Sequence, residues 1–204
     1  MALALAVVVP LLLAARSPLL AWREPIYIAA GLVGVLAMAL LLVQPLMAQG
    51  SLPGLGVGLG RSVHRWLGVA IFVGVLAHVL GLWITSPPDV IDALLFVSPT
   101  AFSVWGVLAM WAVFATAMLA LFRTRLSPGA WRLAHLTLAG VIAIGTVFHV
   151  LQITGTMEWW SKVALSLLVL AATGKVIYDA ALRRTLRRTL RRLTRRGAAG
   201  ARSR

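Results

Sequence analysis

The chain contains no cysteine among its 204 residues, and this absence excludes several kinds of redox and metal site. Disulfides, zinc–thiolate centres, thiolate-held iron–sulfur clusters and covalent c-type haem attachment all need cysteine. Charged residues are also scarce, at 12%, against about a quarter in ordinary soluble domains. Hydrophobic residues make up 61% of the chain, more than a soluble fold of this size can bury. The composition therefore predicts a polytopic membrane protein.

Acidic residues are few, with 5 against 19 lysines and arginines, and the net charge is +14. Ten of the 19 basic residues lie between Arg183 and Arg204, so the charge forms a tail rather than a nucleic-acid-binding face. We expect no nucleic-acid partner. Leucines in the tail share one face of a helix, which suits the anionic lipid of a cytoplasmic leaflet, while docking of a soluble protein is the alternative. These leucines are Leu182, Leu186, Leu190 and Leu193.

Six apolar stretches approach the roughly 20 residues that a membrane-spanning helix needs. We predict an all-α, six-transmembrane-helix bundle over residues 1–182, followed by a basic cytoplasmic tail at residues 183–204. The first stretch is interrupted by Pro10, Arg16 and Pro18. We expect it to be a retained helix, and a cleaved signal peptide, for which it lacks basic residues at its start, is the alternative. The stretches cover about residues 2–22, 27–48, 63–84, 102–122, 133–153 and 159–182.

The distribution of lysine and arginine over the short loops predicts the orientation. With the basic tail inside, the loops that carry arginine are cytoplasmic, and the opposite loops carry acidic residues. A multi-pass protein of the bacterial inner membrane with both termini in the cytoplasm is expected. The cytoplasmic loops contain Arg61, Arg65, Arg123, Arg125 and Arg132, and the opposite loops contain Asp89, Asp92, Glu158 and Lys162. Arg16 and Arg23 are exceptions to this distribution.

All four histidines lie in two of the predicted spans, at equal spacing. His64 and His78 are 14 residues apart, as are His135 and His149. Fourteen residues advance about 1400°, close to four whole turns, so each pair shares one helix face. The rise of about 21 Å places one histidine towards each side of a hydrocarbon core of about 30 Å. Because both spans run in the same direction, His64 is level with His135, and His78 with His149.

Two facing imidazoles at each level suit two six-coordinate b-type haems, with the four histidines as iron ligands. Zinc or copper would need three or four ligands around one ion, which levels about 21 Å apart do not provide. A transporter with a histidine proton relay is the other alternative, and it would be expected to carry acidic residues within its spans. Only Asp179 lies in one.

Other residues near the histidines are candidates for binding the haems. Arg61, Arg65 and Arg132 flank the inner histidines and are predicted to bind haem propionates, although the positive-inside rule alone would place arginines there. Lys162 and Trp83 are weaker candidates for the outer haem. Small residues one turn from each histidine would leave room for a flat macrocycle, or would serve helix packing. These are Gly68, Gly74, Ala139 and Gly145.

Two segments carry a resemblance to a known family. Residues 61–83, RSVHRWLGVAIFVGVLAHVLGLW, and 131–153, WRLAHLTLAGVIAIGTVFHVLQI, resemble the ferric reductase-like transmembrane domain family. That family includes ferric reductases, NADPH oxidases and the haem subunit of the periplasmic methionine-sulfoxide reductase system. The resemblance covers about residues 1–182 and implies His64–His135 and His78–His149 as haem pairs. It also implies electron flow from the cytoplasmic side to an acceptor outside.

Full-length reductases of this family carry flavin and nicotinamide domains after their spans, and this sequence departs from them. The resemblance therefore implies a stand-alone haem module and an oxidoreductase component. Its expected donor is reduced flavin, a cytosolic flavoprotein that supplies FMN or FAD, or quinol. Ferric iron, oxygen and a periplasmic oxidoreductase are the expected acceptors.

Cytochrome b of the quinol-oxidising complexes shares the paired-histidine spacing. The present chain lacks the Pro-Glu-Trp-Tyr motif of that family's quinol site. Two alternatives for the function therefore stand beside transmembrane electron transfer by a ferric reductase-like module. They are a quinol-linked cytochrome b subunit and a non-catalytic membrane anchor of a redox complex.

Overall fold

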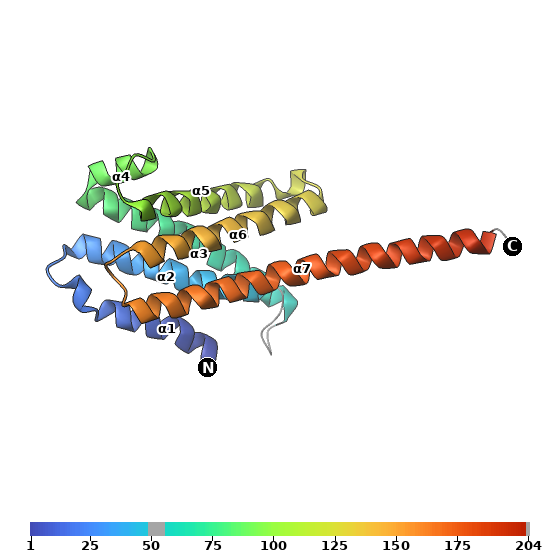
Figure 1. Ribbon diagram of the computed structural model, residues 1–204, viewed down its shortest axis with the longest axis horizontal. Helices are drawn as coiled ribbons and strands as arrows, with labels where there is room; N and C mark the ends of the chain where they lie inside the picture. Colours follow the sequence, from blue (N-terminus) through green and yellow to red (C-terminus); the bar gives the residue numbers. More distant parts are fainter. Residues whose placement is uncertain (49–55, 203–204) are drawn as a thin grey trace.

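The computed structural model describes residues 1–48 and 56–202, and all regular secondary structure in these two ranges is helical. The predicted all-α class is therefore confirmed. The elements run in the order α1 (Ala2–Ala15), η1 (Pro18–Leu20), α2 (Pro25–Ala48), α3 (Val57–Thr85), α4 (Pro87–Leu94), α5 (Ala101–Leu121), η2 (Arg123–Arg125), α6 (Pro128–Gln152) and α7 (Trp159–Arg202). Figure 1 shows a bundle of long helices along one axis, with α7 projecting far beyond one end.

Five of the described helices are long and apolar enough to cross a membrane, which confirms the prediction of a multi-pass membrane protein. Few of their side chains are buried inside the protein, as expected for helices whose outer faces contact lipid. Trp160, 81% exposed, lies at the start of its span, where aromatic side chains favour the membrane interface. The candidate spans are Pro25–Met47, Gly58–Thr85, Ala101–Leu121, Pro128–Gln152 and Trp159–Leu186.

The predicted first span is wrong as a single membrane-crossing helix. α1 has only 14 residues and is therefore about 21 Å long, shorter than a hydrocarbon core of about 30 Å. It ends at Ala15 because the chain turns into η1. Pro18 disfavours a helical backbone conformation at Ser17, and the Ser17 hydroxyl accepts a hydrogen bond from the Leu19 N–H at 3.3 Å. Figure 1 places the N-terminus part-way along the bundle. The described residues thus form five candidate spans and one shorter apolar helix.

Two apolar clusters hold the bundle together and fix the positions of α3 and α6. The larger cluster joins α2, α6 and α7 and contains Met38, Leu165 and Val169, each at most 2% exposed. The smaller cluster joins α3, α5 and α6 through Ile71 and Ile142, with the Phe72 and Phe114 rings 5.2 Å apart beside them. Ile71 and Ile142 are each midway in sequence between the two histidines of their helix. The smaller cluster therefore fills the space between the two histidine levels.

The α6 helix begins at a capped terminus. Ser127 accepts a hydrogen bond from the Ala130 N–H at 3.3 Å, and Pro128 occupies the first helical position, where its missing N–H costs nothing. At the other end of the chain, α7 continues without a break past residue 182, where we predicted the tail to begin. The side chains of Leu190 and Leu193, part of the predicted leucine face, lie outside the described residues.

Candidate functional site

The structure brings the four histidines together in two pairs, each with one ring from α3 and one from α6. The ring centroids of His64 and His135, named the inner pair after the orientation predicted from the sequence, are 6.0 Å apart. Those of His78 and His149, named the outer pair on the same basis, are 6.5 Å apart. The ring planes cross at 69° in the inner pair and at 84° in the outer pair. These are the same partners that the spacing and the direction of the spans predicted.

Three of the four imidazole rings are held by a hydrogen bond from Nδ1 to a helix carbonyl. A carbonyl oxygen only accepts, so Nδ1 carries the hydrogen and Nε2 keeps a free lone pair. Metal-binding histidines are usually held in this way, since the bond fixes both the tautomer and the ring orientation. The bonds join His64 to Gln44 at 2.8 Å, His78 to Ala30 at 2.8 Å and His149 to Phe102 at 2.9 Å.

His135 is held by stacking. Its ring lies parallel to that of Trp131, one turn earlier on α6, with a centroid distance of 5.1 Å and an interplanar angle of 10°. The Arg123 guanidinium lies over the Trp131 ring, 5.2 Å from its centroid. Arg123, from η2, is thus linked to an inner histidine through a cation–π contact. Sequence reasoning placed Arg123 in a cytoplasmic loop but did not assign it to the site.

The separation of the rings fits one metal ion between the two imidazoles of each pair. A bond from a metal such as zinc to imidazole nitrogen is about 2 Å, and the ring centroid lies about 1 Å behind that nitrogen, so the centroids of two opposed ligands lie about 6 Å apart. The observed 6.0 and 6.5 Å agree with this value. Within the described parts of the chain, no group of three or more His, Asp or Glu could hold an ion. A metal-containing group that supplies further ligands of its own would therefore suit these pairs better than a bare ion.

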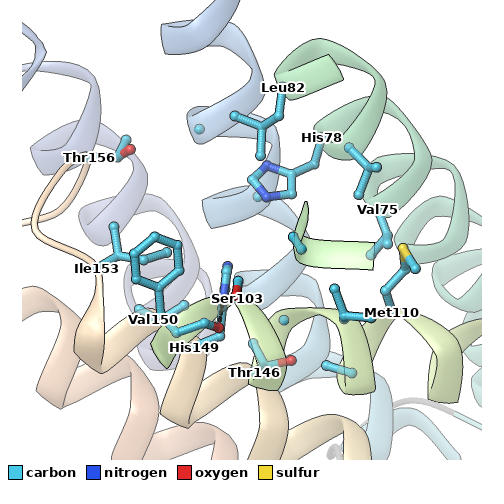
Figure 2. A pocket seen from close by; sticks show the side chains of 18 of the residues that line it. Val75, His78, Leu82, Ser103, Met110, Thr146, His149, Val150, Ile153 and Thr156 are labelled. Carbon is cyan, nitrogen blue, oxygen red and sulfur yellow. Dashed lines mark hydrogen bonds between the residues drawn. The ribbon is translucent and has the colours of Figure 1, made fainter. Parts of the chain in front are cut away.

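A cavity of about 690 Å³ opens between the helices at the outer pair. Figure 2 shows His78 and His149 projecting into it from α3 and α6. Its volume lies within the range of about 300–1,000 Å³ that small-molecule and cofactor sites occupy. Most of its lining is apolar, with Val75, Leu82 and Met110 among the residues labelled in Figure 2. The cavity therefore offers a mostly apolar space beside two imidazoles.

Two glycines allow the outer histidines to reach their carbonyls. Gly34 lies one turn after Ala30 on α2, and a methyl group there would come within 3.0 Å of His78 Nδ1. Gly106 lies one turn after Phe102 on α5, and a methyl group there would come within 2.6 Å of His149 Nδ1. The same arrangement thus occurs twice, on two different helices. The sequence shows only that both positions are glycine, and it does not reveal which helix faces which.

Three of the four small residues chosen from the sequence face neighbouring helices. A methyl group on Gly74 would meet Ala37 of α2, and one on Gly145 would meet the Trp105 carbonyl of α5 at 3.0 Å. Gly68 faces the Gln44 side chain, also on α2. These contacts favour helix packing, the alternative to macrocycle clearance, for all three glycines. Of the predicted arginines, Arg61, Arg65 and Arg132 are all exposed.

The fold and the two sites define a multi-pass α-helical membrane protein with paired imidazoles at two levels. The chain belongs to the ferric reductase like transmembrane component family, whose profile matches residues 30–146, more than half of the sequence. The predicted resemblance is confirmed. Members of this family typically bind haem, and membership implies an oxidoreductase component for transmembrane electron transfer. His64, His78 and His135 lie within the matched residues, and His149 follows them.

Comparisons with curated proteins and with solved structures gave no significant match.

Proposed function

We propose that this chain is a b-type cytochrome that binds two haems and carries single electrons across the membrane. The observation that supports this proposal is the geometry of the two pairs, with centroids 6.0 and 6.5 Å apart and three Nδ1 atoms engaged by carbonyls. His64 and His135 would hold one haem, and His78 and His149 the other. When bound, a haem iron alternates between the ferric and ferrous states and so takes up or releases one electron.

The protein's own residues orient the ligands and keep water away. The carbonyls of Gln44, Ala30 and Phe102 hold three imidazoles with Nε2 free, and Trp131 supports the fourth. Between the levels, the cluster around Ile71 and Ile142 packs apolar side chains of α3, α5 and α6 against one another. A preorganised and apolar environment of this kind tunes a redox group through its second shell and its dielectric.

The direction of transfer and the partners are part of the proposal. Electrons would enter on the cytoplasmic side from reduced flavin, a flavoprotein or quinol, and leave to ferric iron, oxygen or a periplasmic oxidoreductase. Exposed Arg61, Arg65 and Arg132 lie near the inner pair in sequence and would bind anionic groups there, either haem propionates or a donor. The arginine-rich end of α7 would contact anionic lipid.

The first test is the haem content of the purified protein. We expect a low-spin b-type spectrum with about two haems per chain. His149→Leu should remove one of the two, because a single imidazole then remains at the outer level. Gln152→Leu is the matched control, since Gln152 is exposed on the same helix and its side chain donates to the Phe148 carbonyl, 2.9 Å away. A folded wild-type protein without haem would refute the proposal.

Transfer across the membrane is tested in vesicles. Protein reconstituted with reduced flavin inside and ferricyanide outside should reduce the outside acceptor, and His149→Leu should abolish this. If haem is present but no vesicle preparation transfers electrons, the chain is instead a non-catalytic anchor subunit. Reduction by quinol alone, with flavin inactive, would favour the quinol-linked cytochrome b alternative.

A further inference from the structure

The outer cavity contains a buried lysine that the histidine pairs do not account for. Lys162 lies near the start of α7, is 5% exposed and lines the same cavity as His78 and His149. Its Nζ donates a hydrogen bond to the carbonyl of Ile153, just past the end of α6. An ammonium group has three donors, so two remain for other partners. A buried cation of this kind is costly unless an anion lies beside it.

The carboxylates near Lys162 do not form an ion pair with it. Glu158, one turn earlier, is exposed, attracts the ammonium electrostatically from beyond ion-pair distance, and accepts a hydrogen bond from the Ser17 hydroxyl at 2.9 Å. Glu24 and Asp89 line the cavity, and Asp89 accepts from Ser86 at 2.6 Å. Within the described ranges, the ion pair found joins Lys175 to Asp179, away from this cavity. The ammonium of Lys162 is thus without a carboxylate at ion-pair distance in the part of the chain that the structure describes.

We propose that Lys162 binds a carboxylate of the molecule that occupies the outer cavity. This inference rests on the proposed function, because the expected carboxylate is a propionate of the outer haem. A carboxylate on a diffusible acceptor, such as the citrate of a ferric citrate complex, is the other source of the same chemistry. Lys162 acts on the site as a fixed positive charge that orients the carboxylate, and it would favour the reduced, more negative state of a haem bound there.

The test measures the midpoint potential of the outer haem. This haem is identified by its absence from the spectrum of His149→Leu. Lys162→Gln keeps an N–H donor for the Ile153 carbonyl but removes the charge. We expect the midpoint potential of the outer haem to fall and the potential of the inner haem to stay unchanged. Redox-induced infrared spectra of protein carrying ¹³C-labelled propionates should show a shifted carboxylate band in the same variant. Lys175→Met, which removes an exposed lysine on the same helix, is the control and should change neither signal.

A second variant keeps the test decisive if Lys162→Gln folds poorly. Lys162→Arg should keep the potential but shift the propionate band, because a planar guanidinium binds carboxylate in a different geometry. Citrate is titrated against wild-type protein and Lys162→Gln with the haem spectrum or intrinsic fluorescence as the signal. Citrate binding that is at least tenfold weaker in Lys162→Gln, together with an unmoved propionate band, would support a carboxylate site at Lys162. Its ligand would then be a diffusible carboxylate and not a propionate.

An unchanged potential, an unmoved band and equal citrate affinity would together overturn the role of Lys162. Absence of haem from the wild type would instead refute the proposed function. In that case the citrate titration alone decides on Lys162.

Discussion

The glycine beside His149 gives the sharpest prediction about the outer site. In Gly106→Ala, the new methyl carbon would lie 2.6 Å from Nδ1 and 2.7 Å from Cε1 of the His149 ring, closer than real side chains approach. Because the new methyl carbon is fixed to the α5 backbone, the ring must move, and we expect the 2.9 Å bond to the Phe102 carbonyl to be lost. Because helix geometry directs the N–H of residue 106 to that same carbonyl, the carbonyl keeps a partner while the imidazole does not.

The size of the effect follows from the lost bond. A buried donor left without its partner costs about 1–3 kcal/mol. Loss of a second-shell partner typically lowers metal affinity by about 10–100-fold, which is about 1.4–2.7 kcal/mol. We therefore expect haem retention at the outer level to fall at least tenfold in Gly106→Ala. Gly34→Ala should have a smaller effect, because its methyl carbon would lie 3.0 Å from His78 Nδ1.

Haem dissociation from detergent-solubilised protein, followed by absorbance in the presence of a haem scavenger, measures this effect for each level. Gly140→Ala is the control, since its methyl group would meet only Ile177 on α7 at 3.7 Å, an ordinary contact. In that variant the gain in helix propensity should slightly raise the thermal unfolding temperature. The reasoning is refuted if Gly106→Ala retains haem as well as Gly140→Ala does.

Three further predictions concern other parts of the molecule. Trp131→Leu should weaken haem binding at the inner level and leave the outer level intact, whereas Trp131→Phe should largely preserve the stack on His135; equal spectra for the two variants would contradict this. Ile142→Ala should lower the free energy of unfolding by about 2–5 kcal/mol in a denaturant titration, because the side chain is 7% exposed in the cluster between the levels; a loss below about 1 kcal/mol would show that this cluster is loosely packed. Deletion of residues 187–204 should leave both haems bound and reduce binding to anionic vesicles; unchanged vesicle binding would show that the arginine-rich end is not a lipid contact.

Most of the secondary structure could be predicted from the sequence, because helix length and hydropathy are local properties. Five of the six predicted spans correspond to α2, α3, α5, α6 and α7, with ends within a few residues except at the start of α3 and α6 and the end of α7. The first failed because Ser17 and Pro18 end α1 before it reaches membrane length, even though the apolar composition continues to Ala21. Local turn chemistry prevailed over mean hydropathy there.

The candidate site, too, could be predicted from the sequence only in part. The 14-residue spacing placed both histidines of each helix on one face, because that spacing is close to four turns. Residues that act on the histidines from other helices had no such signal. Gly34, Gly106 and the carbonyl of Gln44 come from α2 and α5, and their role depends on which face each helix turns inward. For the same reason the sequence could not distinguish macrocycle clearance from helix packing at Gly74 and Gly145, and their contacts favour packing.

The sequence by itself determined the class of protein and the histidines that could share a level. It also gave the number of long spans to within one, six predicted against five found among the described residues. These follow from composition and from the fixed geometry of an α-helix, which needs no knowledge of neighbours. Only the tertiary structure decided how the rings are held, that Arg123 reaches the inner pair through Trp131, and that Lys162 lies buried beside the outer one. Those facts depend on helix packing, in which residues far apart in sequence meet through the shapes of whole surfaces.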